Sequence, residues 1–93
     1  MNYFRITAYN REQDYSIIMD SFGAYEALWQ FSSALVSKGF SITAVGNEKT
    51  FNEGNIPKIK EQTNKMILRA EANGQPIKNG KQISVGDKNY TTI

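Results

Sequence analysis

The chain contains neither cysteine nor histidine among its 93 residues. The absence of cysteine excludes disulfides and thiolate nucleophiles, and the absence of both residue types removes the usual zinc ligands. Histidine is the most frequent general acid–base group in enzymes, so acid–base catalysis by histidine is excluded as well. The sequence therefore predicts a protein that is not an enzyme and that needs no metal or cofactor.

The carboxylates that remain do not form a recognisable catalytic pair. Such a pair must converge across a cleft, in environments that separate its two pKa values. Asp20 or Ser21 is expected to cap a helix, and Glu26 falls on a polar stripe of that helix. The other acids considered lie in predicted polar loops, and they are Glu12, Asp14, Glu48, Glu53 and Asp87. Solvated surface acids explain this distribution better than catalysis does.

The chain also lacks a long apolar run and a strong charge of either sign. The opening segment MNYFRITAYN is too polar for a signal peptide or a membrane span, so we expect a cytoplasmic protein without a membrane partner. The formal net charge of +2 is too small to indicate nucleic-acid binding by itself, and it argues against an acidic mimic of DNA. A hydrophobic content of 40% is typical of a globular protein, here one domain over residues 1–93.

Alternating apolar and polar residues predict strands over residues 3–9 and 15–20, joined by a polar loop. The β-branched and aromatic segment 40–45 predicts a third strand. Period-two alternation favours a fourth strand over residues 65–72, whereas a 3.6-residue period allows a helix after Pro57. Whether residues 57–66 form loop or helix stays open.

Two dipeptides near the C-terminus predict tight turns. Asn79-Gly80 suits a type I′ turn and Gly86-Asp87 a type II′ turn, so the tail is expected to form β-hairpins arranged as a small meander. The resulting order is ββ-α-β-β followed by hairpins. We predict an α+β fold in which an antiparallel sheet carries one main helix on one face.

The predicted helix, from about Gly23 to Lys38, has an unusually wide apolar surface. At about 100° per residue its apolar arc spans about 200°, twice what a helix needs to sit on a sheet. Tyr25, Trp29 and Val36 form one flank of this arc. Either the rest of the chain covers this flank and Trp29 belongs to the core, or the three residues bind a protein partner.

A second candidate surface is the outward face of the first strand, where aromatic residues alternate with a base. Such a face can stack nucleotide bases and neutralise phosphates. The residues that would bind nucleic acid are Tyr3, Arg5, Tyr9, Lys58, Lys60, Lys65 and Arg69. Tyrosine and threonine are also common in strands that bind nothing. Basic residues with an acidic residue among them usually form a solvated surface. An ordinary strand and a solvated surface therefore explain these residues better than nucleic-acid binding does.

Three segments resemble small proteins encoded on conjugative elements, plasmids and phage-like regions of Gram-positive bacteria. They are YFRITAYN (3–10), DYSIIMDSFGAYEALWQFSSALVSKGF (14–40) and KMILRAEANGQP (65–76). The most specific part is the helix pattern around Tyr25-Glu26 and Leu28-Trp-Gln-Phe-Ser32. This resemblance implies a mobile-element context and names no activity.

The context implied by the resemblance favours an anti-defence role. Small proteins of such elements include anti-CRISPR inhibitors, which bind an RNA-guided nuclease and need only a surface. We therefore expect a non-enzymatic inhibitor whose partner is a CRISPR effector complex. The alternatives are an accessory nucleic-acid-binding protein of the element and a homodimeric structural module.

Overall fold

The computed structural model describes residues 3–22, 25–47, 66–77, 80–85 and 87–92. These residues form an α+β domain made of one helix and a mostly antiparallel set of strands. The elements are β1 (Tyr3–Asn10), β2 (Tyr15–Phe22), α1 (Tyr25–Val36), β3 (Phe40–Asn47), β4 (Met66–Ala72), β5 (Gln75–Pro76), β6 (Gln82–Val85) and β7 (Lys88–Thr91).

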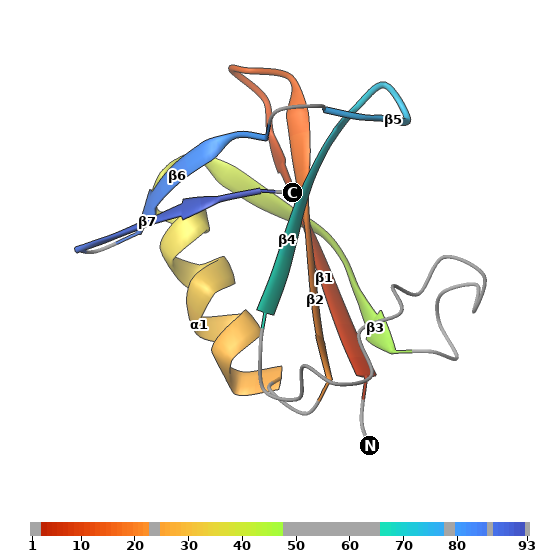
Figure 1. The fold of residues 1–93 in the computed structure, drawn as a ribbon, viewed down its shortest axis with the longest axis vertical. Coiled ribbons are helices and arrows are strands. Elements are labelled where there is room, and N and C mark those ends of the chain that lie inside the picture. The colour runs from red at the N-terminus through yellow and green to blue at the C-terminus, as the bar shows by residue number, and fades with distance from the viewer. Residues whose placement is uncertain (1–2, 23–24, 48–65, 78–79, 86, 93) are drawn as a thin grey trace.

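The main sheet has five strands in the order β3-β1-β2-β4-β5, and each neighbouring pair is antiparallel. Helix α1 covers one face of this sheet and contacts β1, β2 and β3 (Figure 1). The predicted α+β architecture with a single helix on one face is confirmed. The predicted face of β1 is also confirmed, because Ile6 and Ala8 are fully buried beneath the helix.

The predicted cap of the helix is not found at Asp20 or Ser21, and the described part of the helix begins at Tyr25. Strand β2 continues to Phe22, so Asp20 and Ser21 are strand residues and the prediction that one of them caps the helix is wrong. The alternation of β2 persists through this segment, which puts Asp20 on the sheet face opposite Met19. The described helix has twelve residues, and the described residues include no helix long and apolar enough to cross a bilayer.

The C-terminal tail differs in part from the predicted meander. The hairpin of β6 and β7 is confirmed, with Val85 opposite Lys88, although Gly86 in its turn lies outside the described residues. Strand β5 instead turns back onto β4 through Asn73 and Gly74, whose φ angles of 55° and 77° suit a type I′ turn. The predicted Asn79-Gly80 turn includes Asn79, which lies outside the described residues, and the strands on either side, β5 and β6, belong to different sheets.

The β6–β7 hairpin is attached to the rest of the domain through β6. Ile83 belongs to the main core, and the Lys38 ammonium donates a hydrogen bond to the Ser84 carbonyl. The Lys81 N–H donates to the Thr92 hydroxyl at 2.6 Å, and the Thr92 N–H donates back to the Lys81 carbonyl at 3.0 Å. This reciprocal pair closes the base of the hairpin next to Gly80.

We predict that Gly80→Ala destabilises the fold by about 2–3 kcal/mol, more than Gly74→Ala, which we expect to cost about 1 kcal/mol. Both glycines have positive φ, but a Cβ at Gly80 would stand 2.3 Å from the Thr92 carbonyl oxygen, whereas a Cβ at Gly74 meets nothing within 4 Å. Urea denaturation of the two variants measures the difference. Equal losses of unfolding free energy in the two variants would show that the contact of the new Cβ with Thr92 does not destabilise Gly80→Ala.

Candidate functional site

One side of α1 is buried against the sheet. Leu28, Phe31, Ser32 and Leu35 are its buried residues, and they repeat at helical spacing. Ser32 is the only polar residue among these four, and its hydroxyl donates to the Leu28 carbonyl at 2.7 Å. The buried hydroxyl is therefore satisfied within the helix itself.

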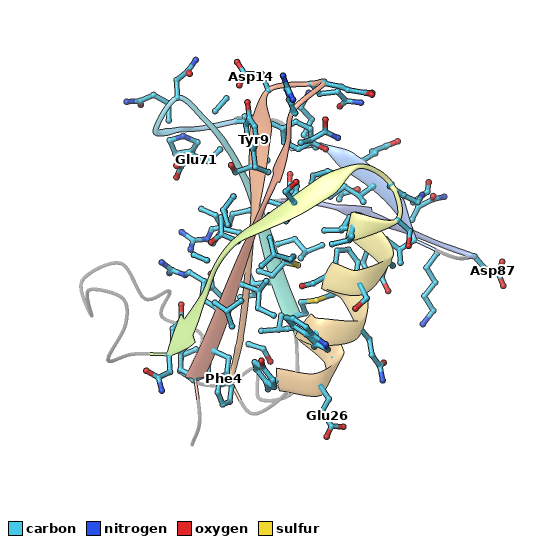
Figure 2. The ribbon with its side chains drawn as sticks, turned by 180° about the vertical axis from the view of Figure 1, so that it is seen from behind. Phe4, Tyr9, Asp14, Glu26, Glu71 and Asp87 are labelled. Carbon is cyan, nitrogen blue, oxygen red and sulfur yellow. The ribbon has the colours of Figure 1, made fainter. Side chains whose placement is uncertain are left out.

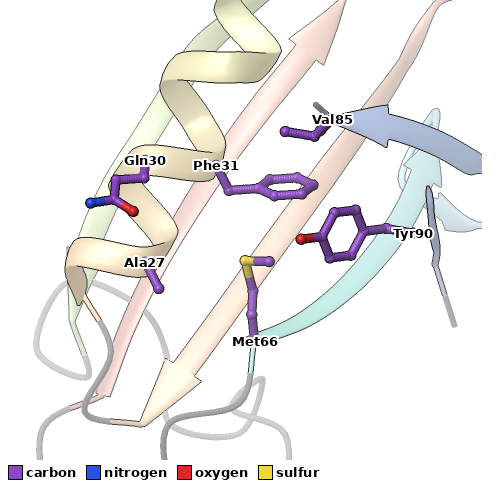
Figure 3. A pocket seen from close by; sticks show the side chains of 6 residues that line it. All are labelled: Ala27, Gln30, Phe31, Met66, Val85 and Tyr90. Atoms are coloured by element: carbon purple, nitrogen blue, oxygen red, sulfur yellow. The ribbon is translucent and has the colours of Figure 1, made fainter. Parts of the chain in front are cut away.

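A second side of α1 is covered by the tail hairpin. The rings of Phe31 and Tyr90 meet edge to face, with centroids 4.9 Å apart. An open depression of about 280 Å³ remains between helix, hairpin and the start of β4 (Figure 3). Its lining residues are Ala27, Gln30, Phe31, Met66, Val85 and Tyr90. The hairpin thus completes the core on the Phe31 side and leaves only a shallow opening.

The third side of α1 stays exposed, and it carries the residues predicted to bind a protein. Tyr25, Trp29 and Val36 are 37%, 47% and 49% exposed, and we call these three residues the aromatic flank. The interpretation of Trp29 as a core residue is wrong, because the hairpin covers the opposite side of the helix. The role of the aromatic flank in binding stays a prediction.

The aromatic flank is ordered by ring contacts. The rings of Tyr25 and Trp29 stack with an interplanar angle of 14° and centroids 6.4 Å apart. Tyr25 also contacts Phe4 of β1, with centroids 4.7 Å apart. Figure 2 shows Phe4 beside the first turn of α1, which Glu26 marks. Trp29 is therefore held in place by a neighbour that is itself anchored on the sheet.

Val45 extends this apolar surface onto β3, and the sequence analysis did not single it out. It is 41% exposed and stands directly opposite Ile6, whose side chain lies under the helix. Directly opposed residues point to the same face of a sheet, so Val45 lies on the helix-bearing face. The β-branched and aromatic residues of FSITAV predict a strand, but only the strand order shows that Val45 is at an edge.

The opposite face of the sheet holds a buried ionic cluster around Asp20. The Asp20 side chain is fully buried, and its Oδ1 atom accepts hydrogen bonds from the Tyr3 hydroxyl and from Arg5 Nε, the latter at 2.8 Å. Its Oδ2 atom pairs with Arg69 Nη2, also at 2.8 Å. A buried carboxylate is stable only when its oxygens are satisfied, and here β1 and β4 both supply donors to β2.

This cluster changes the interpretation of the predicted nucleic-acid surface. Tyr3 is 2% exposed and Arg5 is 7% exposed, so the expectation that both lie on an open sheet face is wrong. The Arg69 side chain is 33% exposed and is engaged by Asp20. Strand periodicity shows which residues share a face of the sheet, but it does not show what covers that face. The sequence alone therefore could not show whether Tyr3 and Arg5 are buried or exposed.

Of the remaining predicted nucleic-acid residues, Tyr9 is the one that the structure describes. The Tyr9 hydroxyl donates to Asp14 at 2.6 Å, at the end of β1 that carries the turn to β2 (Figure 2). Lys58, Lys60 and Lys65 lie outside the described residues. Within the part of the chain that is described, no three acidic, histidine or cysteine side chains gather as metal ligands.

Comparisons with known proteins identify no relative. No protein-family model, no curated protein and no solved structure matches the chain. The resemblance to mobile-element proteins therefore stays a prediction.

We predict that Asp20→Asn destabilises the protein by about 3 kcal/mol or more, because it removes the buried negative charge that pairs with Arg5 and Arg69. Asp14→Asn is the matched control, since Asp14 is exposed and pairs only with Tyr9 among the described side chains. It should change the free energy of unfolding by less than about 0.5 kcal/mol. Chemical denaturation of both variants at neutral pH tests this, and a loss of similar size in both would refute a special role for Asp20.

The Asp20 cluster also predicts a dependence of stability on alkaline pH. Burial, together with the hydrogen bond to Asp20, raises the pKa of Tyr3 far above its ordinary value of 10.0. Neutral Tyr3 therefore stabilises the fold fully below about pH 10, and this contribution is lost as the pH rises above that value. In Tyr3→Phe the decline between pH 10 and the folded-state pKa should be shallower.

The measurement for Tyr3→Phe is the free energy of unfolding at several pH values from neutral to strongly alkaline. Some decline should remain in the variant, because burial also raises the pKa of Tyr15. An identical slope in wild type and variant would mean that Tyr3 titrates equally in the folded and unfolded chains.

Proposed function

We propose that this protein acts by binding a partner protein through the aromatic flank of α1. The observation that carries the proposal is the exposure of Tyr25, Trp29 and Val36 on a helix whose other apolar sides are covered. Tryptophan and tyrosine supply much of the binding energy at protein interfaces when they are desolvated by a partner. In the unbound protein the exposed parts of these rings contribute no such free energy, because they remain in water.

The order of the aromatic flank also supports binding. Trp29 stacks on Tyr25, and Tyr25 is held by Phe4 of the central strand β1. A rigid aromatic side chain loses little conformational entropy when a partner covers it, so more of its burial contributes to affinity. The neighbouring Val45 enlarges the apolar surface without adding charge.

The partner class that we propose to test first is an RNA-guided nuclease. The resemblance to mobile-element proteins supports this choice, and an inhibitor of such a nuclease requires a binding surface rather than catalytic groups. Direct binding of nucleic acid has less support. Tyr3 and Arg5 are committed to Asp20, which removes two of the side chains on which that alternative depended.

We predict that Trp29→Ala abolishes capture of the partner while leaving the fold intact. The experiment uses the tagged full chain in a lysate of a Gram-positive host that carries a CRISPR system, with and without nuclease treatment, read by mass spectrometry. Removing a hot-spot tryptophan typically costs about 2 kcal/mol or more, which corresponds to a loss of about 30-fold in affinity. Thermal unfolding should change little, because Trp29 is 47% exposed.

The matched control is Gln30→Ala, an exposed position on the same helix that lies outside the aromatic flank. It should retain the partner at the wild-type level. A partner that survives nuclease treatment and is retained equally by Trp29→Ala would contradict the proposed interface. Recovery of proteins only when nucleic acid is left intact would favour the nucleic-acid alternative instead.

A further inference from the structure

The two edges of the main sheet are built very differently. Among the described strands, β5 forms one edge and β3 the other. Strand β5 has two residues and includes Pro76, which has no N–H to donate. Short strands and prolines are the usual means by which proteins close a sheet edge against further pairing. Strand β3 has eight residues and contains no proline, so its edge is long by comparison.

The composition of β3 is a second feature of this edge. The strand reads FSITAVGN and carries no charged side chain, although lysines and other charges commonly discourage pairing at an edge. Phe40 is the only one of its residues that is buried. An edge with these properties is suited to accept another extended segment.

The aromatic flank lies along this same edge. Tyr25, in the first turn of α1, contacts Phe4, and Phe4 stands opposite Asn47 at the end of β3. At the other end, only residues 37–39 separate Val36 from the first residue of β3. Helix and strand therefore run side by side in opposite directions. Val45 lies on the helix-bearing face of β3, the edge strand of the described sheet.

We propose that the partner presents an extended segment, which adds to β3 as a further antiparallel or parallel strand of the sheet. This inference rests on the proposed function and specifies the kind of segment that the site accepts. The backbone of β3 supplies hydrogen bonds, and every second side chain of the segment lies on Trp29, Tyr25 and Val45. Strand addition of this type takes affinity from the main chain and specificity from alternate side chains.

The chemistry of the surface defines the segment further. Because β3 and the aromatic flank are uncharged, the side chains that face them should be apolar, while those at the intervening positions are free to be polar. The pattern in the partner is therefore a period of two, without charge at the inward positions. An amphipathic helix would instead present apolar residues three and four positions apart.

A flexible segment fits this edge better than a second copy of the chain. The pairing of β1 with β3 shifts between Thr7 and Ala8, which leaves a bulge at Thr43. A bulge bends the strand and increases its twist. Two copies of β3 facing each other would each carry this bend in a rigid sheet, whereas a free extended segment can follow it.

The test uses a displayed library of random linear peptides of about 12 residues, long enough to pair with a whole strand, selected on the immobilised full chain. We expect the selected peptides to alternate apolar and polar residues. Bound peptide should slow hydrogen exchange at β3 amides. Trp29→Ala and Val45→Lys should each weaken binding at least tenfold, with Gln30→Ala unchanged. Circular dichroism and thermal unfolding establish that each variant is folded.

Three results would overturn strand addition. They are selected peptides with helical spacing, peptide binding without added protection of β3, and concentration-dependent protection of β3 in the protein alone, which would identify a second copy as the occupant. The proposed function fails separately, if Trp29→Ala still captures the partner from lysate. If capture depends on Trp29 but bound peptide does not slow hydrogen exchange in β3, only the proposed strand addition is refuted, and the proposed function stands.

Discussion

The apolar arc of α1 is wider than one sheet face can cover, and this mismatch determines how the rest of the domain is arranged. The sheet buries Leu28 and Leu35, and the β6–β7 hairpin covers Phe31 through Tyr90. The sheet and the hairpin therefore each cover one side of α1, while the side that bears Trp29 remains in contact with water. Among the described residues nothing covers this third side, so a partner that buried it would gain apolar burial without a change in the fold.

The opposite face of the sheet depends on a different interaction. Asp20 joins three strands through hydrogen bonds to Tyr3, Arg5 and Arg69. Charge burial of this kind contributes little net stability compared with apolar packing, but it penalises any register in which the carboxylate loses a partner. A shift of β2 by one residue would move Asp20 to the face beneath α1, next to Leu28, and would move Met19 to the opposite face. The ionic cluster thus specifies the alignment of the strands that support the helix.

Local periodicity was sufficient to predict the main strands, the helix and the composition of its exposed flank. The spacing of Tyr25, Trp29 and Val36 places them on one side of any helix, so their grouping needed no tertiary information. What covers each side depends on contacts distant in sequence, and the chain offers no local sign that Tyr90 meets Phe31 rather than Trp29. The same limit explains why the buried cluster around Asp20 was not predictable, because its partners Arg5 and Arg69 are 15 and 49 residues away in the sequence. The turn at Asn73-Gly74, in contrast, carries a local signal, because this dipeptide is typical of type I′ turns.

The bulge at Thr43 has a consequence for the protein before it meets any partner. The Thr43 hydroxyl donates to the Thr7 carbonyl at 3.2 Å, which ties the bulged residue to the neighbouring strand. Flat, uncharged strands stack into fibrils because each copy offers the next an identical template. A fixed bend makes β3 a poorer template than a flat strand, so it disfavours in-register stacking along the full length of the strand. The bulge at Thr43 therefore discourages association of this edge with copies of itself, although the strand carries no charge.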